Sequence, residues 1–225
     1  MEIAKFDFKI NKNVSFIKNL ENGNFLIKAC DKLSKDQRKN QKENSFYKEV
    51  TNVPFWFNGS GYIKDEVESL YIFNKEENKL EKIREFKNET LNAFAINKNL
   101  NKLALVIGNN DNNVSRLKDD LIILDLENNN ENILIEDTFS FYDLFFDNED
   151  ELIFVATDMK KGGINEDAFI YKSDLLGKYE KISPDDFDKS FGNSIGSDAR
   201  WESNKIFEFK NNKLYFLVTE KEESK

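Results

Sequence analysis

The chain has 225 residues, 39% of them hydrophobic, and carries 33 basic against 42 acidic side chains, which gives a net charge of −9. This hydrophobic fraction supports a sizeable core and argues against disorder, while the acidic balance disfavours binding to nucleic acid or to an anionic membrane. Cys30 is the single cysteine, which excludes an intrachain disulfide and a cysteine metal site. Residues 1–7 lack the apolar stretch of a signal peptide and no apolar run approaches a membrane span, so we expect a cytoplasmic protein.

Short strand-like runs of Phe, Leu, Ile and Val recur along the chain, each next to a polar turn rich in Asn or Gly. Asn and Gly tolerate the positive φ that tight hairpin turns require, so each group of run, turn and run predicts a β-hairpin. Several runs are almost continuously apolar, which indicates strands covered on both faces. In chain order the predicted strands are a lone one at 6–10, then the pairs 14–17 and 25–29, 69–73 and 79–83, 91–96 and 103–107, 120–125 and 132–135, 139–146 and 152–156, 168–172 and 179–182, and 205–209 and 214–218.

Two kinds of hairpin alternate along the chain, so the repeating unit has four strands. Successive copies are marked by the apolar runs that begin at residues 25, 103, 152 and 214. The middle spacing fits a propeller blade of roughly 40–50 residues, and an insertion at about 31–67 lengthens the first spacing. We therefore predict an all-β fold: an incomplete β-propeller over residues 1–225, with about three and a half to four blades of four-stranded antiparallel sheet. A β-sandwich, the competing all-β fold, does not predict this alternation.

Residues 192–196, Gly-Asn-Ser-Ile-Gly, match the G-x-S-x-G pattern of serine hydrolases. The chain has no histidine, and a Ser–His–Asp triad needs an imidazole to take the serine proton. A nucleophile elbow also joins a buried strand to a helix, whereas residues 185–191 do not resemble a buried strand and residues 197–201 do not resemble a helix. We interpret the motif around Ser194 as a loop leading into a blade. We predict no catalytic, cofactor-binding or metal-binding residue in this chain.

Three segments resemble the propeller domain of acylaminoacyl peptidases, which belong to the prolyl oligopeptidase (S9) family of serine peptidases. The first is residues 52–63, Asn-Val-Pro-Phe-Trp-Phe-Asn-Gly-Ser-Gly-Tyr-Ile, followed by the Leu-Tyr-Ile of residues 70–72. Residues 154–159 are similar to a second segment, and residues 192–200 with 213–216 to a third. The resemblance covers roughly residues 14–219, in the same order as in the family.

In that family a seven-bladed propeller caps a C-terminal α/β-hydrolase domain that carries the catalytic Ser, Asp and His. Nothing in this chain matches the hydrolase domain. The resemblance therefore implies that the chain is itself inactive. It also implies a parent protein that is a serine peptidase or hydrolase releasing N-acylated amino acids. The implied partners are the parent's hydrolase domain and short peptides, which the intact propeller would admit while it excludes folded proteins.

Five residues are candidates for the channel or for the interface with that domain: Trp56, Phe57, Asn58, Asp198 and Arg200. Packing within the insertion is at least as good an explanation for the two aromatic residues. An ordinary surface ion pair is favoured for the two charged ones. The acidic stretch 147–151 sits at a predicted hairpin turn, where Asp and Asn are expected in any case.

Two other functions stay open on the sequence alone. A stand-alone interaction propeller of the WD40 kind would typically carry Gly-His and Trp-Asp dipeptides, but the chain has no histidine, and Phe57 and Glu202 follow its two tryptophans. A carbohydrate-binding or glycosidase propeller is a weaker alternative, because nothing singles out a pair of carboxylates. An incomplete propeller also leaves its end blades uncovered, so we predict self-association through them.

Overall fold

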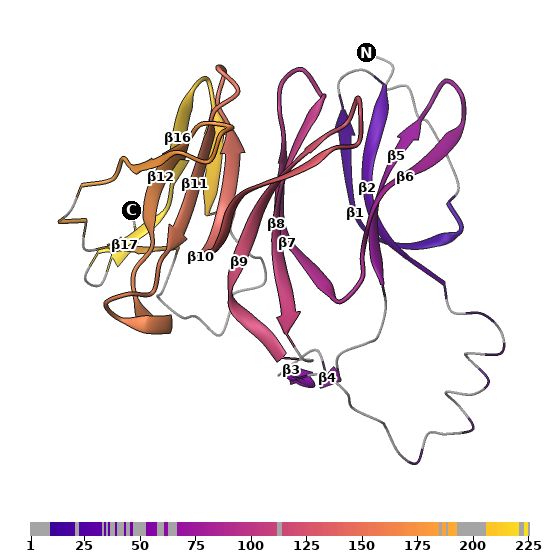
Figure 1. Cartoon of the computed structure of the whole chain (residues 1–225), viewed down its shortest axis with the longest axis horizontal. Coiled ribbons are helices and arrows are strands. Elements are labelled where there is room, and N and C mark those ends of the chain that lie inside the picture. Colours follow the sequence, from indigo (N-terminus) through magenta and orange to yellow (C-terminus); the bar gives the residue numbers. More distant parts are fainter. Residues whose placement is uncertain are drawn as a thin grey trace. The chain divides into compact units, whose positions relative to one another are not determined.

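The computed structural model describes residues 10–20, 23–32, 34, 36, 39, 43, 46, 53–57, 61–62, 67–111, 114–184, 186–187, 189–192, 206–220 and 223–224. The fold is an all-β partial propeller built from antiparallel sheets, as the sequence predicts (Figure 1). The chain divides into two compact units, Met1–Asn88 with Asn112–Val114, and Glu89–Asp111 with Ser115–Lys225. No helix among the described residues is long and apolar enough to cross a membrane.

The first unit holds one four-stranded blade in the order β1-β2-β5-β6. Its strands are β1 (Lys12–Leu20), β2 (Asn24–Asp31), β5 (Glu68–Asn74) and β6 (Lys79–Phe86). Cys30 of β2 pairs with Glu68 of β5, so the chain leaves the sheet for the insertion and returns to it at the same level. Ile27, Ala29, Tyr71 and Phe73 form the core on one face of this sheet.

Most of the insertion predicted at about 31–67 lies outside the described residues. Within it the structure describes a short hairpin of β3 (Trp56–Phe57) and β4 (Gly61–Tyr62), in which Trp56 pairs with Tyr62. The lone strand predicted at 6–10 also lies outside the described residues, apart from Ile10.

The second unit contains a seven-stranded sheet in the order β13-β12-β11-β10-β9-β8-β7, which comprises two blades. Every pair of strands predicted between residues 91 and 182 is present. The strands are β7 (Glu89–Ile96), β8 (Lys102–Asp111), β9 (Val114–Asp125), β10 (Glu131–Phe146), β11 (Leu152–Thr157), β12 (Phe169–Ser173) and β13 (Tyr179–Lys181).

Strand β10 belongs to both of these blades, and here the sequence prediction was wrong in detail. The predicted strands 132–135 and 139–146 are one continuous strand. Its first part pairs with β9, where Glu131 lies opposite Leu124, and its last part pairs with β11, where Phe146 lies opposite Leu152. Between the two ladders Asp137 has a φ of 42°, so the strand bends there as it passes from the outer edge of one blade to the inner edge of the next.

After β13, the described residues of the second unit form two further small sheets, β14-β17-β18 and β15-β16. The described strands are β14 (Ser190–Phe191), β15 (Phe207–Lys210), β16 (Lys213–Phe216), β17 (Val218–Glu220) and β18 (Glu223–Ser224). The predicted final hairpin is present as β15 and β16, and the positive φ values of Asn211 and Asn212 suit its two-residue turn. The predicted strand 214–218 breaks at Leu217, whose amide donates to the Ile206 carbonyl instead.

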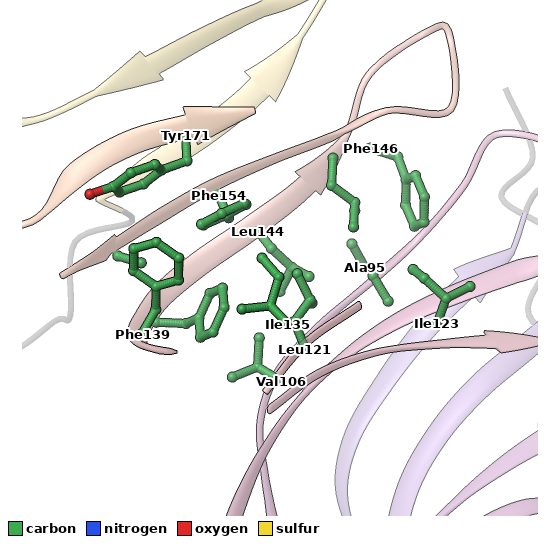
Figure 2. Close-up of a cluster of buried hydrophobic side chains, with 14 residues drawn as sticks. Ala95, Val106, Leu121, Ile123, Ile135, Phe139, Leu144, Phe146, Phe154 and Tyr171 are labelled. Atoms are coloured by element: carbon green, nitrogen blue, oxygen red, sulfur yellow. The ribbon is translucent and has the colours of Figure 1, made fainter. Parts of the chain in front are cut away.

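The core of the second unit joins its two complete blades (Figure 2). Phe139 of β10 is part of this core, with its ring centroid 5.6 Å from that of Phe154 and 4.8 Å from that of Tyr171. Phe154 and Tyr171 stack on each other at 5.3 Å. Such buried aromatic contacts add to the stabilisation that the burial of these large rings provides. The cluster therefore fixes the blades against each other where β10 crosses between them.

Five hairpin turns in the described chain have the same hydrogen-bond arrangement at their first residue. An Asn or Asp side-chain oxygen accepts hydrogen bonds from two backbone amides of the turn that follows, which satisfies donors that the strands leave unpaired. The five residues are Asn74, Asn97, Asp125, Asp147 and Asp174. The Asn-rich and Asp-rich turns of the sequence therefore hold the hairpins in shape.

Candidate functional site

The candidate residues from the sequence are only partly described. Trp56 is half exposed on β3, and Phe57 pairs through its backbone with Gly61. Asn58, Asp198 and Arg200 lie outside the described residues, as does Ser194. The assignment of these residues to a channel or a domain interface therefore stays a prediction.

The start of the G-x-S-x-G motif is described at Gly192. It follows the two-residue strand β14, in which Ser190 is exposed and Phe191 half-buried, so the segment before the motif is not a buried strand. The Gly192 amide donates to the Leu217 carbonyl, and the Thr219 hydroxyl donates to the Gly192 carbonyl at 2.8 Å. These hydrogen bonds fix Gly192, the first residue of the motif, against Leu217 and Thr219. Its φ of 96° is in the left-handed region that favours glycine.

A groove of about 510 Å³ lies in the second unit, at the end of the sheet opposite the hairpin turns of β7–β8 and β10–β11. It combines two cations, one carboxylate and a row of apolar side chains. It is lined by Arg116, Leu117, Lys118, Asp137, Met159, Gly163 and Ile164. Leu117 and Ile164 are each 67% exposed, which is a large apolar exposure for neighbouring positions around one groove.

One wall of the groove is the first part of β9. The ladder between β9 and β10 begins at Asp119, so residues 114–118 of β9 extend beyond it, and Val114 forms an isolated parallel bridge with Val53. Successive side chains of a strand point to opposite faces, yet Arg116, Leu117 and Lys118 all line the groove. The groove therefore meets β9 along its edge, at the place where β10 has left for the next blade.

The opposite wall is the loop between β11 and β12, which is held by its own polar groups. The Thr157 hydroxyl oxygen accepts from the Met159 amide, and one Glu166 carboxylate oxygen accepts from the amides of Lys161 and Gly162. A short 3-10 turn, Gly163–Asn165, follows. This network presents Met159 and Ile164 to the groove without a regular element beneath them.

The charges of the loop interact with those of β9. The Lys160 ammonium lies 2.9 Å from the Asp158 carboxylate. Partial burial acts to raise the pKa of Asp158, but hydrogen bonds from Lys160 and the charges of Lys160 and Lys118 outweigh it and hold that pKa below its usual value. Burial, together with the charges of Asp158 and Glu166, raises the pKa of the nearby Tyr171 to about 12.

Two buried aspartates of β9 anchor β10 at the point where the β9–β10 ladder begins. Asp119 accepts from the Asn92 amide group at 2.9 Å and from the Phe141 backbone amide at 3.2 Å. Asp120 accepts from the backbone amide of Asp137 at 2.9 Å. Burial raises the pKa of Asp119, since the hydrogen bonds to its carboxylate only partly offset the loss of water. The pair fixes the bend of β10 that forms the floor of the groove.

Asp147, Glu149 and Glu151 form an acidic cluster within the described residues at the turn between β10 and β11. Lys172 of β12 lies 3.2 Å from the Asp147 carboxylate and 2.5 Å from that of Glu151. Burial acts to raise the pKa of Asp147, but the amides of Glu151 and Glu149 and the Lys172 ammonium outweigh it and lower that pKa. The cluster is thus an ordered hairpin turn with its own counter-ion, in line with its interpretation as a turn.

None of the residues that line the groove was predicted from the sequence. The one local signal was the pair of basic residues Arg116 and Lys118, which precede the apolar run of β9, whereas the β9–β10 ladder begins at Asp119. A strand end of this kind can be recognised only when the path of the partner strand, here β10, is known.

No protein-family model and no curated protein matches this chain. Among solved structures, the chain is similar to uncomplexed acylaminoacyl peptidase from Pyrococcus horikoshii, with a TM-score of 0.61 and 18% identity over 92% of this chain. It is also similar to an acylaminoacyl peptidase in complex with Z-Gly-Gly-Phe-chloromethyl ketone, with a TM-score of 0.60 and 18% identity. The chain spans only 29% and 28% of those two proteins. The resemblance found in the sequence is therefore confirmed for the fold.

Proposed function

We propose that this chain is a non-catalytic propeller segment of a serine peptidase of the acylaminoacyl peptidase kind, in the prolyl oligopeptidase family. In the intact enzyme it would cap an α/β-hydrolase domain and limit access to short peptides. The proposed partners are that hydrolase domain and the peptides that pass the cap. Residues 1–225 would belong to one incomplete propeller, with the 31–67 segment as an insertion, and the enzyme would work in the cytoplasm.

One observation carries this proposal. The similarity covers 92% of this chain but only 29% of the Pyrococcus horikoshii acylaminoacyl peptidase. A fold that agrees over nearly the whole chain, in a protein more than three times as long, supports a role as one part of a larger enzyme. Because fold alone does not establish function, the role must be tested on the chemistry itself.

The first test is activity of the purified chain on a chromogenic N-acetylated amino-acid substrate. We expect no turnover, because the chain has no histidine to activate a serine. Turnover that disappears in Ser194→Ala would overturn the non-catalytic assignment.

The second test addresses capping. The coding region next to this sequence is read for a hydrolase domain, and that domain is purified alone and together with this chain. We expect the chain to leave cleavage of an acetylated tripeptide unchanged and to suppress cleavage of a reduced, carboxymethylated protein. Equal suppression of both substrates, or of neither, would contradict the filtering role.

A further inference from the structure

We propose that the groove in the second unit binds a free amino acid with an apolar side chain, such as leucine, as its zwitterion. Each part of this ligand has a counterpart among the side chains that line the groove: a cation for its carboxylate, a carboxylate for its ammonium group and an apolar surface for its side chain. The ligand class follows from these side chains alone, so the inference goes beyond the capping role and does not depend on it.

The groove offers one available charge of each sign. The Lys118 ammonium has no ion pair or hydrogen bond among the described residues and acts on Asp158 through its charge. The side chain of the exposed Asp137 also has no such partner in the described part of the chain, although its backbone amide is bonded. Arg116 lines the groove as well, but it has an interaction of its own, so we assign it no role in binding. Because Lys118 and Asp137 are not paired with each other, a ligand that carries both charges is favoured over a simple anion or cation.

The apolar side chains favour a ligand that also carries a hydrophobic group. Leu117 and Ile164 line the groove and are each 67% exposed. Met159 adds an unbranched thioether, which adapts to side chains of different shape. The side chain of leucine would cover this surface and remove it from water, whereas glycine would leave it exposed. A volume of about 510 Å³ is sufficient for such a molecule.

Two residues of the groove are held in the left-handed region of the backbone. The φ of Asp137 is 42° and that of Met159 is 58°, in a region that residues other than glycine rarely occupy. The Asp120 carboxylate accepts from the Asp137 amide, and the Thr157 hydroxyl oxygen accepts from the Met159 amide. Uncommon backbone conformations that the surrounding structure holds in place gather at binding sites. The groove is therefore a surface arranged in advance of binding, with its carboxylate and its thioether both fixed from behind.

The chain contains its own reporter for this binding. Its two methionines are Met1 and Met159, so a chain labelled with methyl-13C-methionine gives one signal from the groove and one internal reference. The probes are leucine and three molecules that each lack one of its parts. Isocaproate lacks the ammonium group, isoamylamine lacks the carboxylate, and glycine lacks the side chain.

We expect leucine to shift the Met159 signal saturably and to leave the Met1 signal unmoved. Isocaproate and isoamylamine should each bind about tenfold more weakly, the loss expected for one charge-assisted hydrogen bond. Glycine should also bind about tenfold more weakly or worse, because it covers no apolar surface. No saturable shift with leucine, or an affinity for any of the three other probes that equals the affinity for leucine, would overturn the proposal.

Two variants assign the two charges separately. Lys118→Gln should weaken binding of leucine and isocaproate by about tenfold and leave isoamylamine unchanged, because isoamylamine has no carboxylate. Asp137→Asn should weaken leucine and isoamylamine by about tenfold and leave isocaproate unchanged. Asparagine tolerates a φ of 42°, so the bend of β10 is retained. Losses that do not follow this pairing of charge and probe would contradict the assignment.

A matched control variant tests whether the loss of any lysine charge has the same effect. Lys213→Gln removes an exposed charge on β16 and should leave the binding of all four probes unchanged. Should either groove variant fail to fold, the four probes on the unaltered chain still decide. Because this assay uses the chain alone, its failure is distinguishable from failure of the capping role, which needs the hydrolase domain.

Discussion

Asp119 shows how one buried charge ties the stability of the second unit to pH. Its carboxylate is 6% exposed and accepts from Asn92 and from the backbone of Phe141. Because burial raises the pKa of Asp119, folding favours its protonated form. Its contribution to stability is therefore fully present below the unfolded pKa and is lost as pH rises through the raised folded pKa.

We predict that Asp119→Asn destabilises the protein by about 1–3 kcal/mol at mildly acidic pH, because an amide cannot accept from both donors. At neutral pH the same substitution also removes a buried charge, so its cost should be smaller there. Urea unfolding of both proteins between pH 4 and pH 8 measures this difference directly.

The exposed Asp186 provides the control for this experiment. Asp186→Asn should change the free energy of unfolding by a small amount that does not vary with pH. If the gap between wild type and Asp119→Asn stays constant or widens as pH rises, the proposed cost of burying the Asp119 charge is wrong.

At the scale of elements, the hairpin turns of successive blades in the second unit are joined to one another. The side-chain amide of Asn97, which is 1% exposed at the β7–β8 turn, donates to the Asp150 carboxylate of the β10–β11 turn. The backbone amide of Asn148 donates in turn to the Asn212 side chain of the β15–β16 turn. These bonds connect three blades at the end of the sheet that lies opposite the groove.

The charge pattern of this connection yields a double-mutant test. Asn97→Asp keeps the oxygen that caps the β7–β8 turn but faces a second carboxylate at Asp150, so we expect it to cost about 2 kcal/mol or more. Asp150→Asn alone should be mild, because its side-chain oxygen still accepts. The double variant should recover most of the lost stability, since the donor and acceptor are simply exchanged.

Urea unfolding of the four proteins gives the coupling energy between the two positions. An additive result, in which the double variant is at least as unstable as Asn97→Asp, would show that the two turns do not interact in solution.

Gly177, in the turn between β12 and β13, lies tightly against the neighbouring strand β10. A Cβ at this position would lie 2.5 Å from the carbonyl oxygen of Leu134, and the φ of Gly177 is 87°. We predict that Gly177→Ala costs about 2 kcal/mol or more, because left-handed strain adds to a clash with backbone that cannot move aside. Thermal unfolding measures the loss.

Gly23 is the matched control, with a φ of 83° and nothing within 4 Å of its would-be Cβ. Gly23→Ala should cost only the left-handed strain, about 1 kcal/mol. Equal losses at the two positions would mean that the contact between Gly177 and Leu134 carries no energy.

The hairpins were predictable because their signals are local. An Asn or Asp at the turn and apolar runs on both sides are enough to place β7–β8 or β15–β16. The continuity of β10 was not predictable, because the polar residues around Asp137 resemble a loop. The carboxylates of Asp119 and Asp120, which are far away in the sequence, and the aromatic core at Phe139 hold them in one strand. The groove forms where β9 extends beyond the β9–β10 ladder, so it could not be predicted from the sequence either.

At the scale of the whole molecule, the alternation of hairpins in the sequence and the propeller fold agree. The prediction of four-stranded units follows from repetition, which a single chain reveals without any relative. The sheet edges that a unit leaves uncovered depend on which strands lie at the ends of its sheets. Among the described strands of the first unit, β1 stands at one end of the strand order, and its Val14 and Ile17 are 40% and 50% exposed.

An exposed sheet edge with apolar side chains is a template for pairing with another chain. We therefore predict that the purified protein self-associates with rising concentration, and that Val14→Lys with Ile17→Lys weakens this association, because a strand-edge charge opposes pairing. Sedimentation velocity and light scattering measure the mass. Leu176→Lys, at a turn residue that is 90% exposed, should leave association unchanged and thereby show that a new charge alone is not responsible. A protein that stays monomeric at its highest soluble concentration, or a β1 variant that associates as readily as the wild type, would assign the edge of β1 no role in assembly.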